Sequence, residues 1–114
     1  MKYKEIASTN GGFKYFVRDL EQELYTHGIV NFFVSSITVT EDSLRITIET
    51  CFEDKEKALN EDEVSDYLER ITNVLVDVLS VRYGRNKSLI VVEGKSDGKN
   101  GFDFVCSDKQ AEQE

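Results

Sequence analysis

The chain has 114 residues, a length that suits one domain with an ordinary hydrophobic core. Its 39% apolar and 11% aromatic content excludes wholesale disorder, and no run approaches the ~20 apolar residues of a membrane span. A net charge of −8 opposes direct binding to nucleic acid, because that binding needs cations to release counterions from phosphates. The first ten residues lack the apolar segment of a signal peptide, so we expect a cytoplasmic protein without membrane contact.

The first predicted element is a helix that begins after Ser8-Thr9-Asn10. Its apolar residues have the three- and four-residue spacing of an amphipathic helix, and they are Phe13, Phe16, Val17, Leu20 and Leu24. Gly28 follows at the position where many helices end in a left-handed residue. The only histidine, His27, lies next to it, and we expect its imidazole to satisfy helix-end carbonyls and to have no catalytic role.

A β-hairpin is predicted next, from two strands joined by the turn Glu41-Asp42. In residues 30–39 we expect one face to carry Phe33, Ile37 and Val39 and the other to carry Phe32 and Val34. Residues 43–52 alternate more cleanly between apolar and polar. The side chains expected to point inward from this second strand are Leu44, Ile46, Ile48 and Phe52.

A second helix is predicted after the charged connection 53–57. Asn60 and Glu63 have the spacing of a capping box, and acids in the first turn complement the helix dipole. The expected buried stripe consists of Val64, Leu68, Ile71, Leu75, Val78 and Leu79, with Tyr67 and Val74 at its edges. Gly84 is expected to end the helix. Three cations near that end are expected to complement the helix dipole, namely Arg82, Arg85 and Lys87.

Residues 88–93 and 102–107 predict a second hairpin, with 94–101 as its loop. The loop contains Gly94-Lys95-Ser96, the core of a phosphate-binding loop. That loop also needs a glycine five residues earlier, where Leu89 stands, and a helix directly afterwards, where strand-like alternation follows. We therefore expect no nucleotide, and we expect the loop glycines to provide the positive φ angles of a tight turn.

The element order α-β-β-α-β-β predicts an α+β two-layer sandwich, with a four-stranded antiparallel sheet and two helices on one face. Residues 1–107 are expected to form this single domain, and residues 108–114 a polar, flexible tail. Cys51 and Cys106 lie in separate predicted strands, so buried thiols are favoured over a disulfide. No clustered ligands or nucleophile–base pair are evident, so the sequence predicts no enzyme, catalytic residue, metal or cofactor.

Negative charge is concentrated in residues 53–69, where eight acids accompany two lysines and the net charge is −6. Such a surface increases solubility, and it also speeds encounter with a basic partner and fixes its orientation. Residues 82–99 carry a weaker net charge of +3 without interleaved aromatics. We expect the acidic segment to contact a basic protein partner through Glu53, Asp54, Glu56, Glu61, Asp62, Asp66 and Glu69.

In general character the chain is similar to small acidic inhibitors that occupy a nucleic-acid channel, such as phage anti-CRISPR and anti-restriction proteins. The likeness is one of composition, and no family motif carries it. The expected function is therefore non-enzymatic inhibition of a basic nucleic-acid-handling partner. The alternatives are an immunity protein to a nuclease toxin and a homo-oligomeric phage assembly or chaperone-like protein. Exposed Val76 or Val81 on the second helix would favour such a homodimer.

Overall fold

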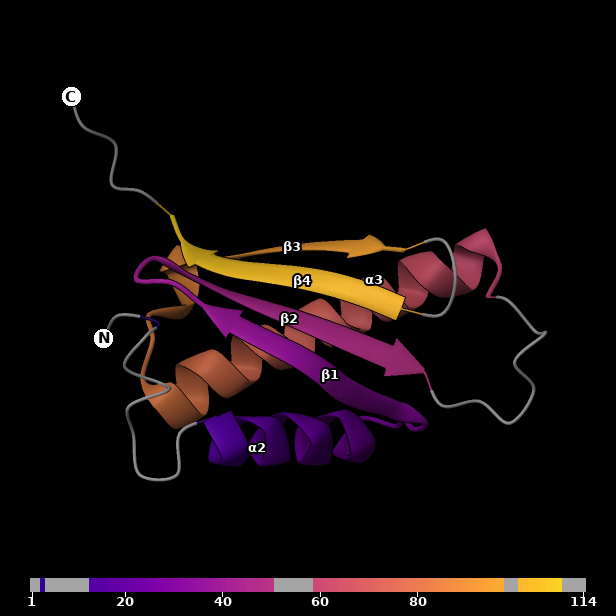
Figure 1. The fold of residues 1–114 in the computed structure, drawn as a ribbon, viewed down its shortest axis with the longest axis horizontal. Helices are drawn as coiled ribbons and strands as arrows, with labels where there is room; N and C mark the ends of the chain where they lie inside the picture. Colours follow the sequence, from indigo (N-terminus) through magenta and orange to yellow (C-terminus); the bar gives the residue numbers. More distant parts are fainter. Residues whose placement is uncertain (1–2, 4–12, 51–58, 98–100, 110–114) are drawn as a thin grey trace.

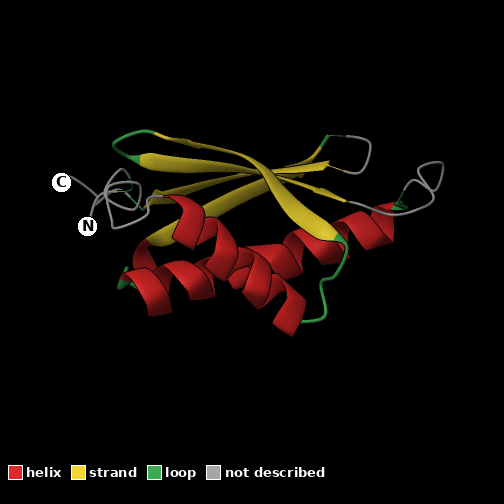
Figure 2. Ribbon diagram, turned by 60° about the horizontal axis from the view of Figure 1, so that its bottom comes forward, coloured by secondary structure: helices red, strands yellow, loops and turns green. Residues whose placement is uncertain are grey.

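The computed structural model describes residues 3, 13–50, 59–97 and 101–109. They form a four-stranded antiparallel sheet in the order β1-β2-β4-β3 (Figure 1). Both helices lie on the same side of this sheet (Figure 2), so the predicted α+β two-layer sandwich is confirmed. The elements are α2 (Phe13–Thr26), β1 (Phe32–Val39), β2 (Ser43–Thr50), α3 (Glu61–Asp77) with a π-helical last turn (Val78–Arg82), a 3₁₀ turn (Lys87–Leu89), β3 (Ile90–Ser96) and β4 (Gly101–Asp108).

The hydrophobic core lies between the helices and the inner face of the sheet. On the helix side it contains Phe16, Leu20 and Leu24 of α2 and Ile71, Val74 and Leu75 of α3. On the sheet side it contains Leu44, Ile46 and Ile48 of β2 and Phe102, Phe104 and Cys106 of β4. The predicted inward positions of β2 from Leu44 to Ile48 are confirmed, whereas Phe52 lies outside the described residues. Complete burial of each large apolar side chain contributes roughly 1.5–3 kcal/mol relative to exposure.

The end of α2 is fixed by backbone hydrogen bonds around Gly28, as the sequence predicts. Gly28 has a φ of 76°, which glycine adopts without the steric cost of a side chain. Its N–H donates to the Tyr25 carbonyl at 3.0 Å, and the N–H of the buried Ile29 donates to the Leu24 carbonyl at 2.9 Å. This pair of bonds is a Schellman motif, which satisfies helix-end carbonyls and turns the chain toward β1.

The predicted capping box at the start of α3 is also confirmed. The side chain of Asn60 accepts the Glu63 N–H at 2.8 Å, and the Glu63 carboxylate accepts the Asn60 N–H at 3.3 Å. At the other end the helix widens into its π-helical turn, and Gly84 follows with a φ of 65°. The N–H of Arg85 then returns to the Leu79 carbonyl at 3.1 Å, so Gly84 ends the helix as expected.

The predicted faces of β1 are wrong because the strand contains a bulge. The pairing of β1 with β2 shifts between Val34 and Ser36, so that Ser35 is an extra residue. An extra residue reverses the alternation of side chains beyond it. The core therefore receives Phe32 and Val34 before the bulge and Ile37 and Val39 after it, as partly buried residues. Phe33 was expected beside Ile37, but it lies on the other face and is 39% exposed.

The hairpin loop predicted over 94–101 is shorter in the structure, because Gly94, Lys95 and Ser96 belong to β3. Gly94 is not among the described glycines with a positive φ. A Cβ at this position would lie 2.6 Å from the Phe104 ring, so glycine is needed for close packing and not for a turn. The loop residues 98–100 lie outside the described part of the chain.

Both ends of this second hairpin differ from the predicted strands. Leu89 was expected in a buried strand, but it ends the 3₁₀ turn and is 43% exposed. The side chain of Asn86 starts that turn by accepting the Ser88 N–H at 3.1 Å, a local bond that competes with strand pairing. At the other end, β4 continues through Asp108, the first residue of the predicted tail.

Candidate functional site

The predicted partner-binding acids lie partly within the described structure, at the start of α3. Glu61, Asp62, Asp66 and Glu69 are all exposed, whereas Glu53, Asp54 and Glu56 lie outside the described residues. Helical spacing places Asp62, Asp66 and Glu69 on one side of α3, away from the buried Ile71 and Leu75. We call these three residues the acidic face.

Among the described residues, cations neutralise little of the acidic face. Asp66 forms an exposed ion pair with Arg70 at 3.4 Å, an interaction worth little in water. No described cation pairs with Asp62 or Glu69. Arg70 is also held elsewhere, because its Nη2 donates to the His27 carbonyl at 3.0 Å. The helix therefore presents concentrated negative charge to solvent.

The hydrogen bond from Arg70 to the His27 carbonyl shows that the predicted role of the His27 imidazole is wrong. The His27 carbonyl, directly after α2, accepts a hydrogen bond from the guanidinium of Arg70 in the neighbouring helix, and no described hydrogen bond joins the imidazole to a helix-end carbonyl. The imidazole instead lies on the surface with its Nε2 3.7 Å from a Glu23 carboxylate oxygen. The end of α2 is therefore capped by the Gly28 and Ile29 N–H groups and, at the His27 carbonyl, by a residue 43 positions away.

The three cations expected at the end of α3 pair with carboxylates of other segments. Arg82 contacts Glu23 at 3.3 Å and Asp19 at 3.7 Å, both in α2. Lys87 contacts Asp77 at 3.5 Å, and Arg85 pairs with Asp108 at the end of β4. Their main role is thus to join elements, which the local sequence around residues 82–87 does not reveal.

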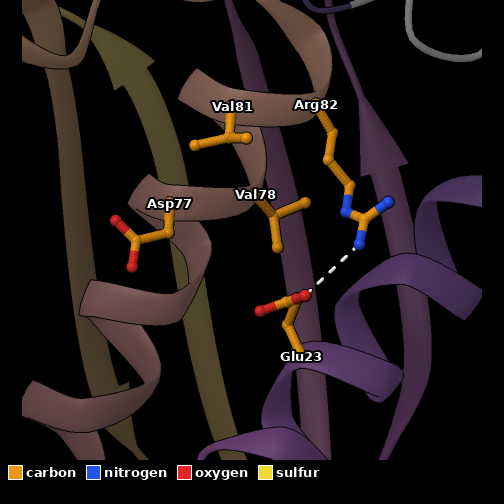
Figure 3. Close-up of a pocket in the computed structure, with 5 residues that line it drawn as sticks. All are labelled: Glu23, Asp77, Val78, Val81 and Arg82. Carbon is orange, nitrogen blue, oxygen red and sulfur yellow. Dashed lines mark hydrogen bonds and ion pairs between the residues drawn. The ribbon is translucent and has the colours of Figure 1, made fainter.

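A groove of about 670 Å³ lies where the end of α3 passes α2. Figure 3 shows the Arg82 guanidinium directed toward the Glu23 carboxylate across this groove. The lining residues are Glu23, Asp77, Val78, Val81 and Arg82. Each carboxylate of the groove has a cationic partner, Arg82 for Glu23 and Lys87 for Asp77. Its most accessible apolar side chain is Val81, which is 81% exposed. The groove suits a contact with an apolar side chain better than it suits acid–base chemistry, because its carboxylates already have cationic partners.

A partly buried charged cluster joins Tyr3, Arg85 and Asp108. The Arg85 guanidinium lies 3.7 Å from the centre of the Tyr3 ring and also binds the Asp108 carboxylate. The Tyr3 hydroxyl donates to the same carboxylate at 3.2 Å. Burial opposes the charge on Arg85, but hydrogen bonding and attraction from Asp108 and Tyr3 outweigh it and raise the Arg85 pKa. Burial also raises the pKa of Tyr3, so its hydroxyl remains a donor.

Sequence reasoning missed this cluster because its members are far apart in the chain. Tyr3 precedes the first helix, and Asp108 was assigned to a flexible tail. The one local signal was the position of Arg85 directly after Gly84, where the chain reverses. The cluster joins Tyr3 and the end of β4 to Arg85, just after α3, and we assign it a structural role.

Cys106 is a buried thiol, as the sequence predicts, and its reactivity can be tested. Its side chain is completely buried in β4, and burial raises its pKa to about 12. Because the thiolate is the reactive form, we expect Cys106 to resist alkylation at pH 8 until the protein unfolds. Peptide mapping after timed alkylation measures this site alone, independently of Cys51. Equal labelling of Cys106 in native and urea-unfolded protein would contradict the assignment.

Three further observations bear on the class of site. Among the described residues, no group of three or more His, Cys, Asp or Glu side chains is arranged to hold a metal ion. None of the described helices has both the length and the apolar character required to cross a bilayer. Comparison with known proteins finds no matching family model, curated protein or solved structure.

Proposed function

We propose that this chain is a small non-enzymatic binding protein that docks its acidic face on a basic, nucleic-acid-handling protein and thereby inhibits it. The observation that supports the proposal is the acidic face itself. Asp62, Asp66 and Glu69 project together from α3, and neither Asp62 nor Glu69 has a described cationic partner. These three residues are exposed and lie opposite the buried residues of α3, so the acidic face is accessible to a protein partner.

The sign and density of the charge suit competition with nucleic acid for a cationic channel. From Asp62 to Glu69 the helix rises by about 10 Å, so that it carries a carboxylate every ~5 Å. One strand of DNA carries a phosphate every ~3.4 Å along the helix axis. The two spacings differ, but both arrays concentrate negative charge along a line, so a cationic channel attracts either one, and the long-range attraction speeds the encounter.

The test compares two charge-reversed variants as baits in a quantitative pull-down. Asp66→Lys with Glu69→Lys changes the acidic face, whereas Asp42→Lys with Glu49→Lys gives the same change of net charge elsewhere on exposed positions. Both variants should remain folded, because exposed charges contribute little to stability. We expect a partner that binds the wild type and the control, is lost with the acidic-face variant, and is displaced by salt and by nucleic acid.

The purified partner then decides between an inhibitory contact and nonspecific attraction. We expect the acidic-face variant to associate more slowly and with a weaker dependence on salt, while the control keeps the wild-type rate. Equal association of all three proteins at low salt would show that the acidic face contributes only solubility. Binding that leaves the partner's nucleic-acid affinity unchanged would contradict the inhibitory role.

A further inference from the structure

The two edges of the sheet differ in whether their outward-pointing backbone groups are covered. β1 and β3 are the edge strands. At the β1 edge, a carboxylate oxygen of Glu21 in α2 accepts the Val34 N–H at 3.1 Å, and the bulge at Ser35 follows at once. A covered N–H and a bulge are two devices by which proteins prevent a strand edge from pairing with another chain. The β1 edge is therefore protected.

At the β3 edge, the outward peptide groups of Val92 and Gly94 have no such protection among the described residues. The N–H of Asp97 donates to the Gly101 carbonyl at 3.0 Å, and the Leu89 carbonyl accepts the Lys109 N–H. The pairing of β3 with β4 is regular between these bonds. In antiparallel strands the groups of alternate residues point to the same neighbour, so the odd-numbered residues of β3 face β4.

The peptide groups of Val92 and Gly94 must then point away from β4, toward the free edge. No described helix or strand lies beyond β3 in the sheet (Figure 1). No hydrogen bond from the described part of the chain reaches these outward groups of Val92 or Gly94. Gly94 is also exposed, so its backbone is accessible. The free edge thus has donors and acceptors ready for another strand.

The side chains beside Gly94 make this edge complementary to itself. Glu93 and Lys95 are both exposed, and both lie on the face of the sheet away from the helices. If two copies of β3 pair antiparallel about a two-fold axis at Gly94, each Glu93 lies opposite Lys95 of the second copy. An axis at Glu93 would place Glu93 opposite Glu93 of the second copy. An axis at Val92 would place Glu93 opposite Val91 of the second copy. The charges therefore select the register centred on Gly94.

We propose that β3 is the interface for a second copy of this chain, which adds its own β3 antiparallel and forms one continuous sheet. The two-fold axis is perpendicular to the sheet, so the helices of both copies cover the same face. The contact consists of backbone hydrogen bonds around the paired Gly94 residues and two Glu93–Lys95 ion pairs. This inference is independent of the basic partner, because the acidic face lies on α3.

Sedimentation equilibrium of charge variants tests the interface and its register. Because a strand-edge contact is small, we expect a weak dimer of the wild type. It should be detectable when the protein concentration is raised to about 1 mM. In E93K and K95E, each opposed pair becomes two like charges, and we expect the dissociation constant of the dimer to rise about tenfold or more. The matched control E49K changes the same charge on β2, on the same sheet face, and should dimerise as the wild type does.

Mixing the two variants provides the decisive measurement. In a mixed pair of E93K with K95E every lysine faces a glutamate, so we expect a heterodimer about as stable as the wild-type dimer. Thermal unfolding confirms that each variant is folded, which matters for K95E because Lys95 also lies opposite Asp103 within the chain. The proposal is overturned if the wild type is monomeric at about 1 mM. It is equally overturned if E93K and K95E dimerise like the wild type, or if their mixture stays monomeric.

Discussion

Truncation of Ile46 or Leu75 to alanine is expected to lower the free energy of unfolding by about 2–5 kcal/mol. Both side chains are completely buried, one in the sheet and one in α3. Ile46 is paired with Ile37 of β1 on one side and with Phe104 of β4 on the other. Its removal leaves a cavity in the middle of the sheet that rigid neighbours cannot fill, so the cost exceeds the lost transfer free energy.

Urea unfolding followed by circular dichroism measures this loss for each variant. Val81→Ala is a suitable control, because it also removes apolar atoms but at an 81% exposed position. We expect the control to change the free energy of unfolding by less than about 0.5 kcal/mol. Losses of that small size at both Ile46 and Leu75 would show that the two layers do not share a core.

Loss of the Asp108 carboxylate is expected to have the second largest effect, about 2 kcal/mol in Asp108→Ala. The variant leaves the charge of Arg85, whose side chain is 4% exposed, without that carboxylate. Breaking a fully buried ion pair costs about 3–5 kcal/mol, and the 45% exposure of the Asp108 side chain reduces this figure through solvent screening. The Tyr3 hydroxyl loses its acceptor in the same variant.

A double-mutant cycle identifies the cause. Arg85→Met removes the charge while keeping an apolar chain beneath Tyr3, so Arg85→Met combined with Asp108→Ala should be more stable than Asp108→Ala alone. Asp42→Ala, at an exposed turn position, is the matched control and should have little effect. If the changes in the free energy of unfolding caused by the two substitutions simply add, the pairing of Arg85 with Asp108 contributes nothing beyond packing.

The elements with strong local signals were predictable from the sequence. The capping box at Asn60 and the left-handed residue Gly28 depend on residues a few positions apart, and both are present as expected. The inward positions of β2 followed from a strict alternation that no irregularity interrupts. Short-range chemistry therefore fixed the element order and most of the core.

The errors arose where distant residues decide the local structure. An extra residue at Ser35 reversed the faces of β1, because the pairing partner in β2 determines where a bulge lies. The sequence around Gly94 indicates a turn, but the glycine is required because the Phe104 ring packs against it. The acids of α3 were correctly expected at the surface, but the ion pairs of Arg82 with α2 depend on how the two helices meet.

The bond from Glu21 to the Val34 N–H has a consequence for how far assembly can proceed. A sheet with two open edges can add copies at both sides and grow into a filament, as cross-β fibres do. Here one edge is closed by a carboxylate from the chain's own helix and by the bulge beside it. If two copies join through β3 as proposed, the join uses the open edge of both copies, and growth would stop at a closed pair. In such an assembly Glu21, on the surface of an amphipathic helix, would limit polymerisation by covering the Val34 N–H.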